Sequence, residues 1–328
     1  MIEIKGLTKR YGALTALEDL TLSIGPGEIF GFIGPNGAGK TTTMKILSCL
    51  LRADAGSASI DGLDVTRDGD KIRRLIGYMP DFIGVYDDLT VGEYLQFFAS
   101  AFGVPRSRRR AVIDGVLELT DLTGKRDAMV ESLSRGMTQR LGVARVLIHD
   151  PKVLLLDEPA SGLDPRARIE MRSLLTELGR MGKSLMVSSH ILSELGEMST
   201  SIGIIEKGKL IYAGTLKDAL EKTRGGERIA VTLEPGGASA GAVRGVLERD
   251  ERVAGVKVVS SREGEAGEAA GVNGGAAERL LVELRPGAHG HHFVIEGVLA
   301  AGGRIGSFEP QGVKLEDAFL RLTKGVLQ

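Results

Sequence analysis

The 328-residue sequence contains a single cysteine, no tryptophan and only 4% aromatic residues. One cysteine, Cys49, cannot close an intrachain disulfide or build a thiolate-rich metal site, which fits a reducing compartment. The 42 basic and 43 acidic residues nearly cancel, so bulk charge would not hold this protein to nucleic acid. Apolar runs such as Val153 to Leu156 are far shorter than the roughly 20 residues of a spanning helix, and the N-terminal segment lacks a signal-peptide core. We therefore expect a cytoplasmic protein that is not itself a channel and has no nucleic-acid partner.

Length and composition indicate two domains. A chain of this length exceeds one ordinary domain, and 42% hydrophobic with 26% charged residues suits a protein with a substantial core. The composition changes after Thr223, where Arg224-Gly225-Gly226 is typical of a linker. We predict a main domain over residues 1–223 and an accessory or regulatory domain over residues 224–328.

In the main domain, short apolar stretches alternate with helical patterns. Strands are predicted at Glu28 to Ile33, at Val153 to Leu156 and at Ser184 to Ser188, with helical periodicity between the last two. This alternation predicts an α/β fold with a parallel sheet and crossover helices. A helical insert is expected over about residues 90–150.

In the accessory domain, the patterns follow the order β–α–β–β–α–β, which predicts a small α+β unit of the ferredoxin-like type. Its predicted elements are the strands Arg228–Leu233, Val256–Ser260, Arg279–Leu284 and Arg304–Glu309, the helices Ala240–Arg249 and His292–Ala301, and a final helix Leu315–Thr323. Residues 262–278, between its halves, are rich in glycine, alanine and glutamate without periodicity, which predicts a disordered loop.

A glycine-rich loop lies between the strand that ends at Ile33 and a segment with helical spacing. Its residues fit G-x-x-x-x-G-K-[ST] and read Gly34-Pro35-Asn36-Gly37-Ala38-Gly39-Lys40-Thr41-Thr42. Glycines let the backbone N–H groups of such a loop surround phosphate oxygens at a helix N-terminus. Lys40 would reach the β and γ phosphates, and the Thr41 hydroxyl would bind Mg²⁺. The loop therefore predicts a nucleoside-triphosphate site rather than a plain glycine-rich turn.

Two carboxylates, Asp157 and Glu158, directly follow the apolar run that ends at Leu156. Parallel strand ends would bring them to the same edge of the sheet as the phosphate loop. Asp157 would hold Mg²⁺ through water, and Glu158 would polarise the attacking water. An Asp-Glu pair alone is weak evidence, but its convergence with the loop predicts triphosphate hydrolysis.

The segment Leu133-Ser134-Arg135-Gly136-Met137 resembles the Leu-Ser-Gly-Gly-Gln signature of the nucleotide-binding domains of ABC transporters. The resemblance extends over about residues 1–220 and keeps the family order of motifs, which is Tyr11, the glycine-rich loop, the signature, Asp157-Glu158, Ser161-Gly162-Leu163-Asp164 and His190. It implies a P-loop NTPase of the ABC type with a helical insert, using ATP and Mg²⁺.

The resemblance also implies a role for each motif. Tyr11 would stack on adenine, Asp164 would belong to the nucleotide site, and His190 would join Glu158 as a catalytic residue that contacts the γ-phosphate. Ser134 and Gly136 would bind the γ-phosphate of ATP held by another subunit, because they precede a predicted helix, Thr138–Ile148, whose N-terminus attracts anions. This implies a homodimer with two shared ATP molecules, with a heterodimer as the alternative.

Three residues depart from the family pattern. Arg135 replaces a glycine of the signature, and Met137 replaces its glutamine. Asp81 stands where the family has a glutamine that ligates Mg²⁺ and senses the membrane partner. Two roles therefore stay open for Asp81, a ligand of Mg²⁺ or a relay to that partner.

The resemblance implies an ATPase subunit that energises export through a separately encoded permease, at the cytoplasmic face of the cell membrane. The segment from Leu315 to Leu322 is similar to the tails of ATPase subunits from exporters of drugs, lipids or polysaccharides. Phe97, Phe98 and Phe102 would form part of a groove for a permease helix or pack in the insert's core. The alternative function is a non-transport ABC ATPase of translation or DNA repair, although the sequence has neither two such domains nor a long coiled coil.

Overall fold

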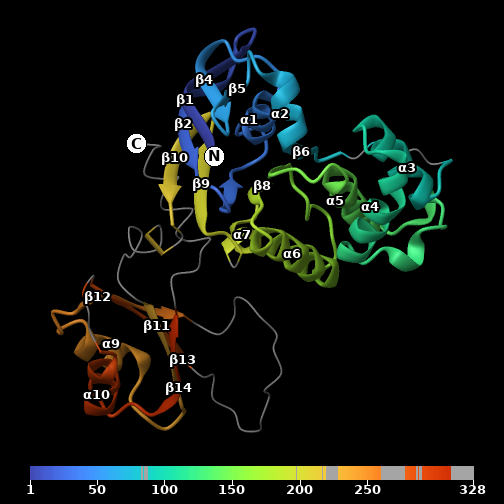
Figure 1. Cartoon of the computed structure of the whole chain (residues 1–328). Coiled ribbons are helices and arrows are strands. Elements are labelled where there is room, and N and C mark those ends of the chain that lie inside the picture. Colours follow the sequence, from blue (N-terminus) through green and yellow to red (C-terminus); the bar gives the residue numbers. More distant parts are fainter. Residues whose placement is uncertain are drawn as a thin grey trace. The chain divides into compact units, whose positions relative to one another are not determined.

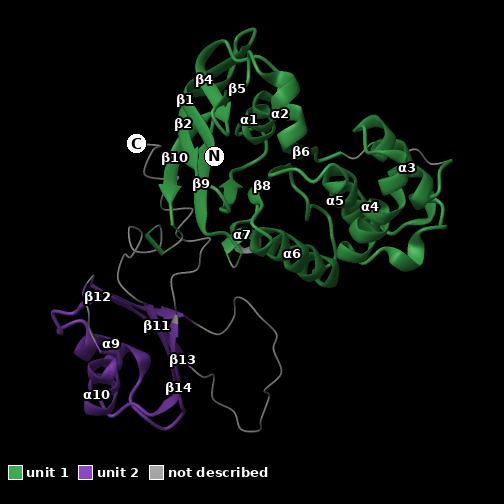
Figure 2. Cartoon of the chain, viewed as in Figure 1, with its two compact units in different colours: residues 1–219, 322–328 green, residues 220–321 purple. Residues whose placement is uncertain are grey.

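The computed structural model describes residues 1–82, 84, 88–196, 198–215, 217–218, 228–259, 278–285, 287 and 290–311. They fall into two compact units, one within residues 1–218 and one within residues 228–311 (Figure 2). The predicted boundary after Thr223 and the predicted final helix lie outside the described residues. So does the predicted loop 262–278, except that Glu278 belongs to a strand instead.

A six-stranded sheet forms the centre of the first unit (Figure 1), in the order β10-β9-β3-β8-β7-β6. Its strands are β3 (Ile29–Ile33), β6 (Ile76–Met79), β7 (Val153–Leu156), β8 (Ser184–Ser189), β9 (Ser201–Glu206) and β10 (Lys209–Gly214). All neighbours are parallel except β10, which pairs with β9 in the antiparallel sense. Parallel strands are covered on both faces, which explains why β3, β7 and β8 are buried along their whole length.

A smaller antiparallel sheet, in the order β2-β1-β4-β5, completes the upper part of this unit in Figure 1. Its strands are β1 (Ile2–Tyr11), β2 (Leu14–Ile24), β4 (Ala55–Ile60) and β5 (Leu63–Asp64), and the helices α1 (Lys40–Leu47) and α2 (Gly69–Leu75) lie beside it. One apolar core joins the two sheets through α1, because Ile4, Phe30 and Met44 belong to the same buried cluster.

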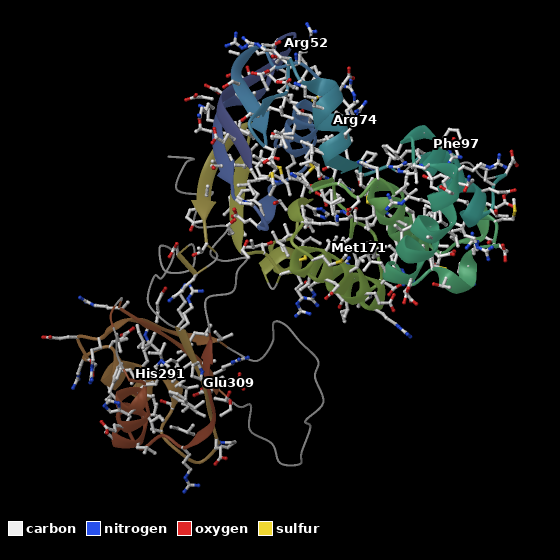
Figure 3. All side chains as sticks on the ribbon, viewed as in Figure 1. Arg52, Arg74, Phe97, Met171, His291 and Glu309 are labelled. Atoms are coloured by element: carbon white, nitrogen blue, oxygen red, sulfur yellow. The ribbon has the colours of Figure 1, made fainter. Side chains whose placement is uncertain are left out.

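Helices occupy the region where the helical insert was predicted. It consists of α3 (Val91–Ala101), α4 (Arg106–Leu119), single turns at Thr123–Lys125 and Val130–Ser132, and α5 (Arg135–Leu147). A capping box starts α3, since the Thr90 hydroxyl accepts from the Glu93 amide at 3.2 Å and the Glu93 carboxylate accepts from the Thr90 amide at 2.9 Å. Phe98 packs edge-on against Tyr94, whereas Phe97 remains half exposed (Figure 3). The predicted aromatic group therefore serves partly as core and partly as surface.

Two further helices described in the first unit are α6 (Pro165–Arg180) and α7 (Leu192–Gly196). Among the described residues, none of the helices combines the length and the apolar character needed to span a bilayer.

The second unit has the predicted order β–α–β–β–α–β. Its elements are β11 (Arg228–Leu233), α9 (Ala240–Leu247), β12 (Val253–Val259), β13 (Glu278–Leu284), α10 (His292–Ala300) and β14 (Ile305–Gln311). The sheet is antiparallel in the order β12-β13-β11-β14. Ile229, Val243 and Phe293 belong to one buried cluster, so both helices pack on the sheet.

The main domain should fold without the accessory domain. The apolar cluster around the two sheets of the first unit draws on residues between 1 and 210, and the cluster of the second unit draws on residues between 229 and 308, so no residue is shared. A fragment of residues 1–223 should therefore remain monodisperse and unfold cooperatively, as measured by circular dichroism during heating. Aggregation of the fragment, with the full chain well behaved, would show that the domains depend on a shared core.

Candidate functional site

Four strand ends bring the predicted motifs to one edge of the central sheet. The glycine-rich loop follows β3, Asp81 follows β6, Asp157 and Glu158 follow β7, and His190 follows β8. Since β6, β7, β8 and β3 are parallel, their carboxyl ends point the same way. The motifs predicted from separate parts of the sequence therefore meet at one site.

Backbone contacts set the shape of the loop at residues 34–42. The Gly34 amide donates to the Ser189 carbonyl at 3.2 Å, and the Ala38 amide donates to the Pro35 carbonyl at 3.1 Å. Gly39 has a left-handed φ of 112°, and a Cβ there would lie 2.7 Å from the Ala16 carbonyl oxygen. Only glycine fits this position, and α1 begins directly after it, so the first-turn amides face the loop.

Lys40 is buried between the loop and the catalytic carboxylate predicted from the sequence. Its side chain is only 6% exposed, and its Nζ donates to the Gly34 carbonyl at 2.6 Å and to the Pro35 carbonyl at 3.3 Å. The same Nζ lies 3.2 Å from Glu158 Oε1. These partners offset the free energy of removing an ammonium group from water, and they place its charge where phosphates would bind.

Glu158 is held from both sides. Its Oε1 faces Lys40, and its Oε2 lies 2.8 Å from His190 Nδ1. Its backbone adopts a left-handed φ of 51°, which costs about 1–2 kcal/mol for a residue with a side chain. The Glu158 amide donates to the Ser188 hydroxyl at 2.8 Å, which stabilises this conformation. Strain of this kind concentrates at functional sites, and here it aims the carboxylate along the sheet edge.

Asp157 offers an oxygen suited to a metal-bound water. The residue is fully buried, and its Oδ1 accepts from the Ser188 hydroxyl at 2.6 Å. Its Oδ2 is buried without a hydrogen-bond partner among the described residues. Those residues contain no group of three His, Cys, Asp or Glu side chains able to hold a metal ion by itself. The arrangement fits Mg²⁺, which takes few protein ligands and keeps phosphate oxygens and waters in its octahedral shell.

Asp81 adds a third negative charge near this group. It is exposed at the end of β6, and partial desolvation raises the pKa of its carboxyl, with further contributions from Asp157 and Glu158. The positive charges of Arg135 and Lys40 act in the opposite direction. Asp81 therefore lies within electrostatic reach of Asp157, Glu158, Arg135 and Lys40.

Tyr78, on β6, is a polar group that sequence analysis did not single out. Burial raises the pKa of its hydroxyl to about 12, with additional contributions from Asp157 and Asp81. The hydroxyl oxygen is buried and has no hydrogen-bond partner among the described residues. It therefore keeps its proton at neutral pH and is a donor beside the carboxylates.

The signature segment begins helix α5 earlier than predicted. The helix starts at Arg135 rather than at Thr138, because the Ser134 hydroxyl caps it by accepting from the Met137 amide at 3.4 Å. Gly136 consequently lies within the first turn instead of preceding the helix. Ser134 is exposed at this N-terminus, and its predicted contact with ATP on another subunit stays a prediction.

The structure places Tyr11 and Asp164 in local roles. Tyr11 ends β1 opposite Leu14, is 47% exposed, and has the Lys9 ammonium 5.7 Å from its ring centre. The hairpin that it belongs to also contributes Ala16 to the wall of the glycine-rich loop. Asp164 caps α6, where its Oδ1 accepts from the Ala167 amide at 2.9 Å. Their predicted nucleotide contacts stay predictions.

Ser188 is the functional residue that sequence reasoning missed. Its hydroxyl connects Asp157 Oδ1 with the Glu158 amide, so it positions both carboxylates. The available signal in the sequence was a serine within the predicted strand β8, but the sequence of that strand does not show which neighbouring residues the serine contacts.

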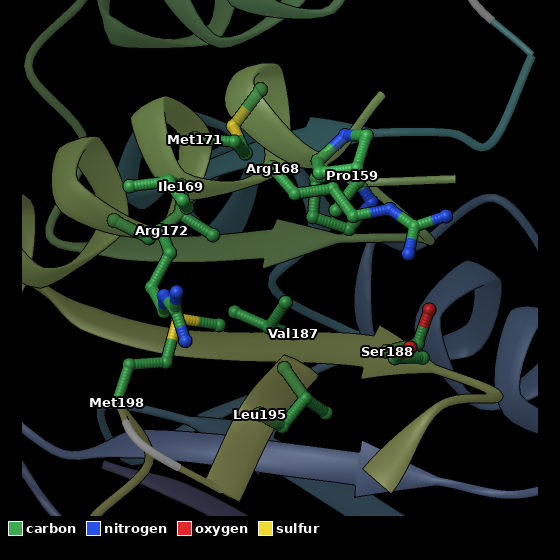
Figure 4. A pocket seen from close by; sticks show the side chains of 13 residues that line it. Pro159, Arg168, Ile169, Met171, Arg172, Val187, Ser188, Leu195 and Met198 are labelled. Carbon is green, nitrogen blue, oxygen red and sulfur yellow. The ribbon is translucent and has the colours of Figure 1, made fainter. Parts of the chain in front are cut away.

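Behind the end of β8 lies a cavity of about 320 Å³, lined on the α6 side by Ile169 and Met171 and on the β8 side by Val187 (Figure 4).

Comparison with known proteins identifies the family. Residues 17–161 match the family model described as "ABC transporter". The chain is 39% identical over 214 residues to "Nod factor export ATP-binding protein I" of Ralstonia nicotianae, covering 65% of this chain and 67% of that protein. It is 42% identical over 220 residues to "Uncharacterized ABC transporter ATP-binding protein YhcH" of Bacillus subtilis, covering 66% and 71%.

A solved structure agrees with these sequence relationships. The dimeric post-hydrolysis state of the ATP-binding cassette MJ0796, bound to ADP and Pi, matches with a TM-score of 0.60 and 26% identity, over 66% of this chain and 99% of that one. These matches leave about a third of the chain uncovered, so the ferredoxin-like assignment of the accessory domain stays a prediction. With the relatives above, the match shows that the main fold is that of an ABC-type P-loop ATPase. The chain belongs to the family of ABC transporter ATP-binding proteins.

Proposed function

We propose that this ABC ATPase energises export through a separately encoded membrane permease. The observation that carries the ATPase assignment is the contact of one buried carboxylate, Glu158, with both Lys40 and His190 at the end of the parallel sheet. Export is supported by the relative named for Nod factor export. The relatives and the structure reported above are named as transporter components, and none supports the alternative of a translation or repair ATPase.

Different residues of this chain would carry out different steps of ATP hydrolysis. The loop at residues 34–42 and Lys40 would hold the phosphates, and Thr41 with Asp157 would hold Mg²⁺. When bound, the ion would supply positive charge to the phosphate oxygens. Glu158 would accept the proton of the attacking water, and His190 would orient that carboxylate and contact the γ-phosphate.

A second copy of the chain would complete each site. Ser134 is the N-cap of α5 and is exposed, so the N-terminus of this helix is open to an anion from another molecule. The similar cassette with ADP and Pi is dimeric, which supports a shared nucleotide arrangement here. A homodimer is the default, and a heterodimer with a related subunit is the alternative.

The permease partner is supported by exposed aromatic residues beside Asp81 and on the helical region 91–147. Phe82 directly follows Asp81 and is 85% exposed, and Phe97 and Phe102 on the insert are about half exposed. Exposed aromatics of this kind suit an apolar helix of a partner. Binding there would place the chain peripherally at the cytoplasmic face of the membrane.

Replacement of Glu158 tests the catalytic assignment. Glu158→Gln should keep ATP binding but slow hydrolysis by roughly 10² to 10⁴, because glutamine cannot accept the proton of water. Steady-state phosphate release and nucleotide binding would be measured on both forms. Near-normal turnover in the mutant would contradict the role of Glu158 as general base.

The same variant tests the shared sites. Because it retains ATP, Glu158→Gln should dimerise when ATP is added, since binding of the nucleotide and of the second copy are linked. Light scattering at millimolar ATP measures this, with nucleotide-free protein as the control. A variant that binds nucleotide yet stays monomeric would argue against ATP shared between subunits.

Asp81→Ala separates the two roles of Asp81. A carboxylate ligand close to the ion tightens its binding, so its loss would raise the Mg²⁺ concentration for half-maximal ATPase several-fold. A relay would leave that concentration unchanged, and the mutant would instead lose stimulation by the reconstituted permease. We expect the relay result, because Asp157 and Thr41 already offer oxygens to an ion that retains waters. A several-fold shift for the isolated subunit would reject a relay-only role.

A further inference from the structure

The cavity behind the end of β8 is separate from the phosphate site. It has a volume of about 320 Å³ and lies between α6 and the end of β8 (Figure 4). Its lining includes the residues directly after Glu158 and directly before His190. Among the described residues that line it, none belongs to the glycine-rich loop, and neither Glu158 nor His190 is one of them. A molecule in this cavity would therefore lie beside the catalytic groups without occupying the place of ATP.

The walls of the cavity are largely apolar. The aliphatic and methionine side chains of its lining are Ile169, Met171 and Leu175 of α6, Val187 of β8, Leu195 of α7, and Met198. Methionine side chains adapt their shape to what they contact. An apolar cavity of about 150 Å³ holds one benzene molecule, so about twice that volume has room for an apolar body of about eight carbons.

The charged part of the lining is basic. Arg168 and Arg172 both line the cavity, and they lie on the same face of α6 because they are four residues apart (Figure 4). Among the described residues of the lining, none is an aspartate or a glutamate. Both arginines also interact within the chain. A guanidinium carries five N–H donors, however, so each can bind a carboxylate in addition to its own partner.

We propose that this cavity is a second ligand site, which binds a small amphipathic anion. The apolar body of the ligand, about eight carbons long, packs between α6 and β8, and its carboxylate or sulfonate binds Arg168 and Arg172. The site is distinct from the ATP site, so the proposal does not depend on the roles assigned to Glu158 and His190.

Octanoate is a suitable probe, because two methionines report on the cavity directly. We would titrate octanoate into the nucleotide-free full chain with ¹³C-labelled methionine methyl groups and record their NMR signals. The signals of Met171 and Met198, assigned from Met171→Leu and Met198→Leu, should follow one saturation curve. The dissociation constant should be on the order of 0.1 to 1 mM, as for a ligand of about ten non-hydrogen atoms.

Two other methionines are internal controls. Met44 is fully buried in the core of the two sheets, and Met181, directly after α6, is 56% exposed, and neither lines the cavity. Their signals should stay in place during the titration. The proposal would be overturned if Met171 and Met198 showed no saturating shift, or if Met44 and Met181 shifted equally.

The head group is tested with Arg172→Gln and with a neutral probe. The variant should weaken octanoate binding about three- to ten-fold and leave binding of octan-1-ol unchanged, because only the carboxylate loses a charged hydrogen bond. Arg180→Gln is the matched control, since Arg180 also belongs to α6 but pairs with Glu177 at 3.5 Å and does not line the cavity. Equal affinities of the wild type for octanoate and octan-1-ol would refute an anionic ligand.

The position of the ligand is tested by filling the cavity. Ile169 lines it and is 55% exposed, so Ile169→Trp should fold and yet remove binding of both probes, because the larger side chain takes up the space. Ile169→Leu, which conserves the volume, should keep binding. Melting temperatures verify that each variant is folded. Undiminished octanoate binding by folded Ile169→Trp would show that the ligand lies elsewhere.

Discussion

Strand β8 pairs in parallel with both β3 and β7, and this pairing sets the relative positions of the glycine-rich loop, Asp157, Glu158 and His190. Ile33 lies opposite Ser189, and Leu156 lies opposite Val187, so the phosphate loop, the carboxylates and His190 leave the sheet at nearly the same level. A slip of one residue would turn the strands' side chains to the other face. All residues of these three strands are buried, so such a slip would move each side chain out of the surroundings in which it is packed.

The site concentrates charge where little water reaches it. Lys40 and Glu158 are 6% and 11% exposed, so each depends on the other, and on the loop carbonyls, to offset desolvation. A triphosphate bound in the loop would compete with Glu158 for Lys40. Weakening of that ion pair leaves the carboxylate held by His190 and by its backbone, and therefore available to a water molecule. Substrate binding and activation of Glu158, the proposed general base, would in this way be parts of one rearrangement of charge.

Local patterns in the sequence were sufficient to predict three of the four strands whose ends form the site, namely β3, β7 and β8, whereas β6 was not predicted. An apolar run followed by glycines or carboxylates can be recognised from the sequence without knowledge of tertiary contacts. The β–α–β–β–α–β order of the second unit could be predicted for the same reason, because each of its elements has its own local pattern. The hairpin β4-β5 was not predicted, because Ala55-Gly56-Ser57 lacks strand character and pairs only through β1. Ser188 contacts Asp157, and Arg135 contacts Gly162, and in both pairs the residues are about 30 positions apart in the sequence. Sequence spacing alone does not predict contacts of this kind.

The signature segment at the start of α5, which is predicted to bind ATP on a second copy, packs against the loop after Glu158 and the start of α6. The first turns of α5 and α6 meet at small residues, since a Cβ at Gly136 would lie 3.0 Å from the Ala167 Cβ. Arg135 lies on Gly162, so the signature segment also contacts the loop that begins at Glu158. Packed segments of this kind move as one body rather than bending independently. A displacement of α5 caused by ATP on another subunit would therefore shift the loop that begins at Glu158, the proposed catalytic carboxylate, and this would provide a physical route for communication between the two proposed shared sites.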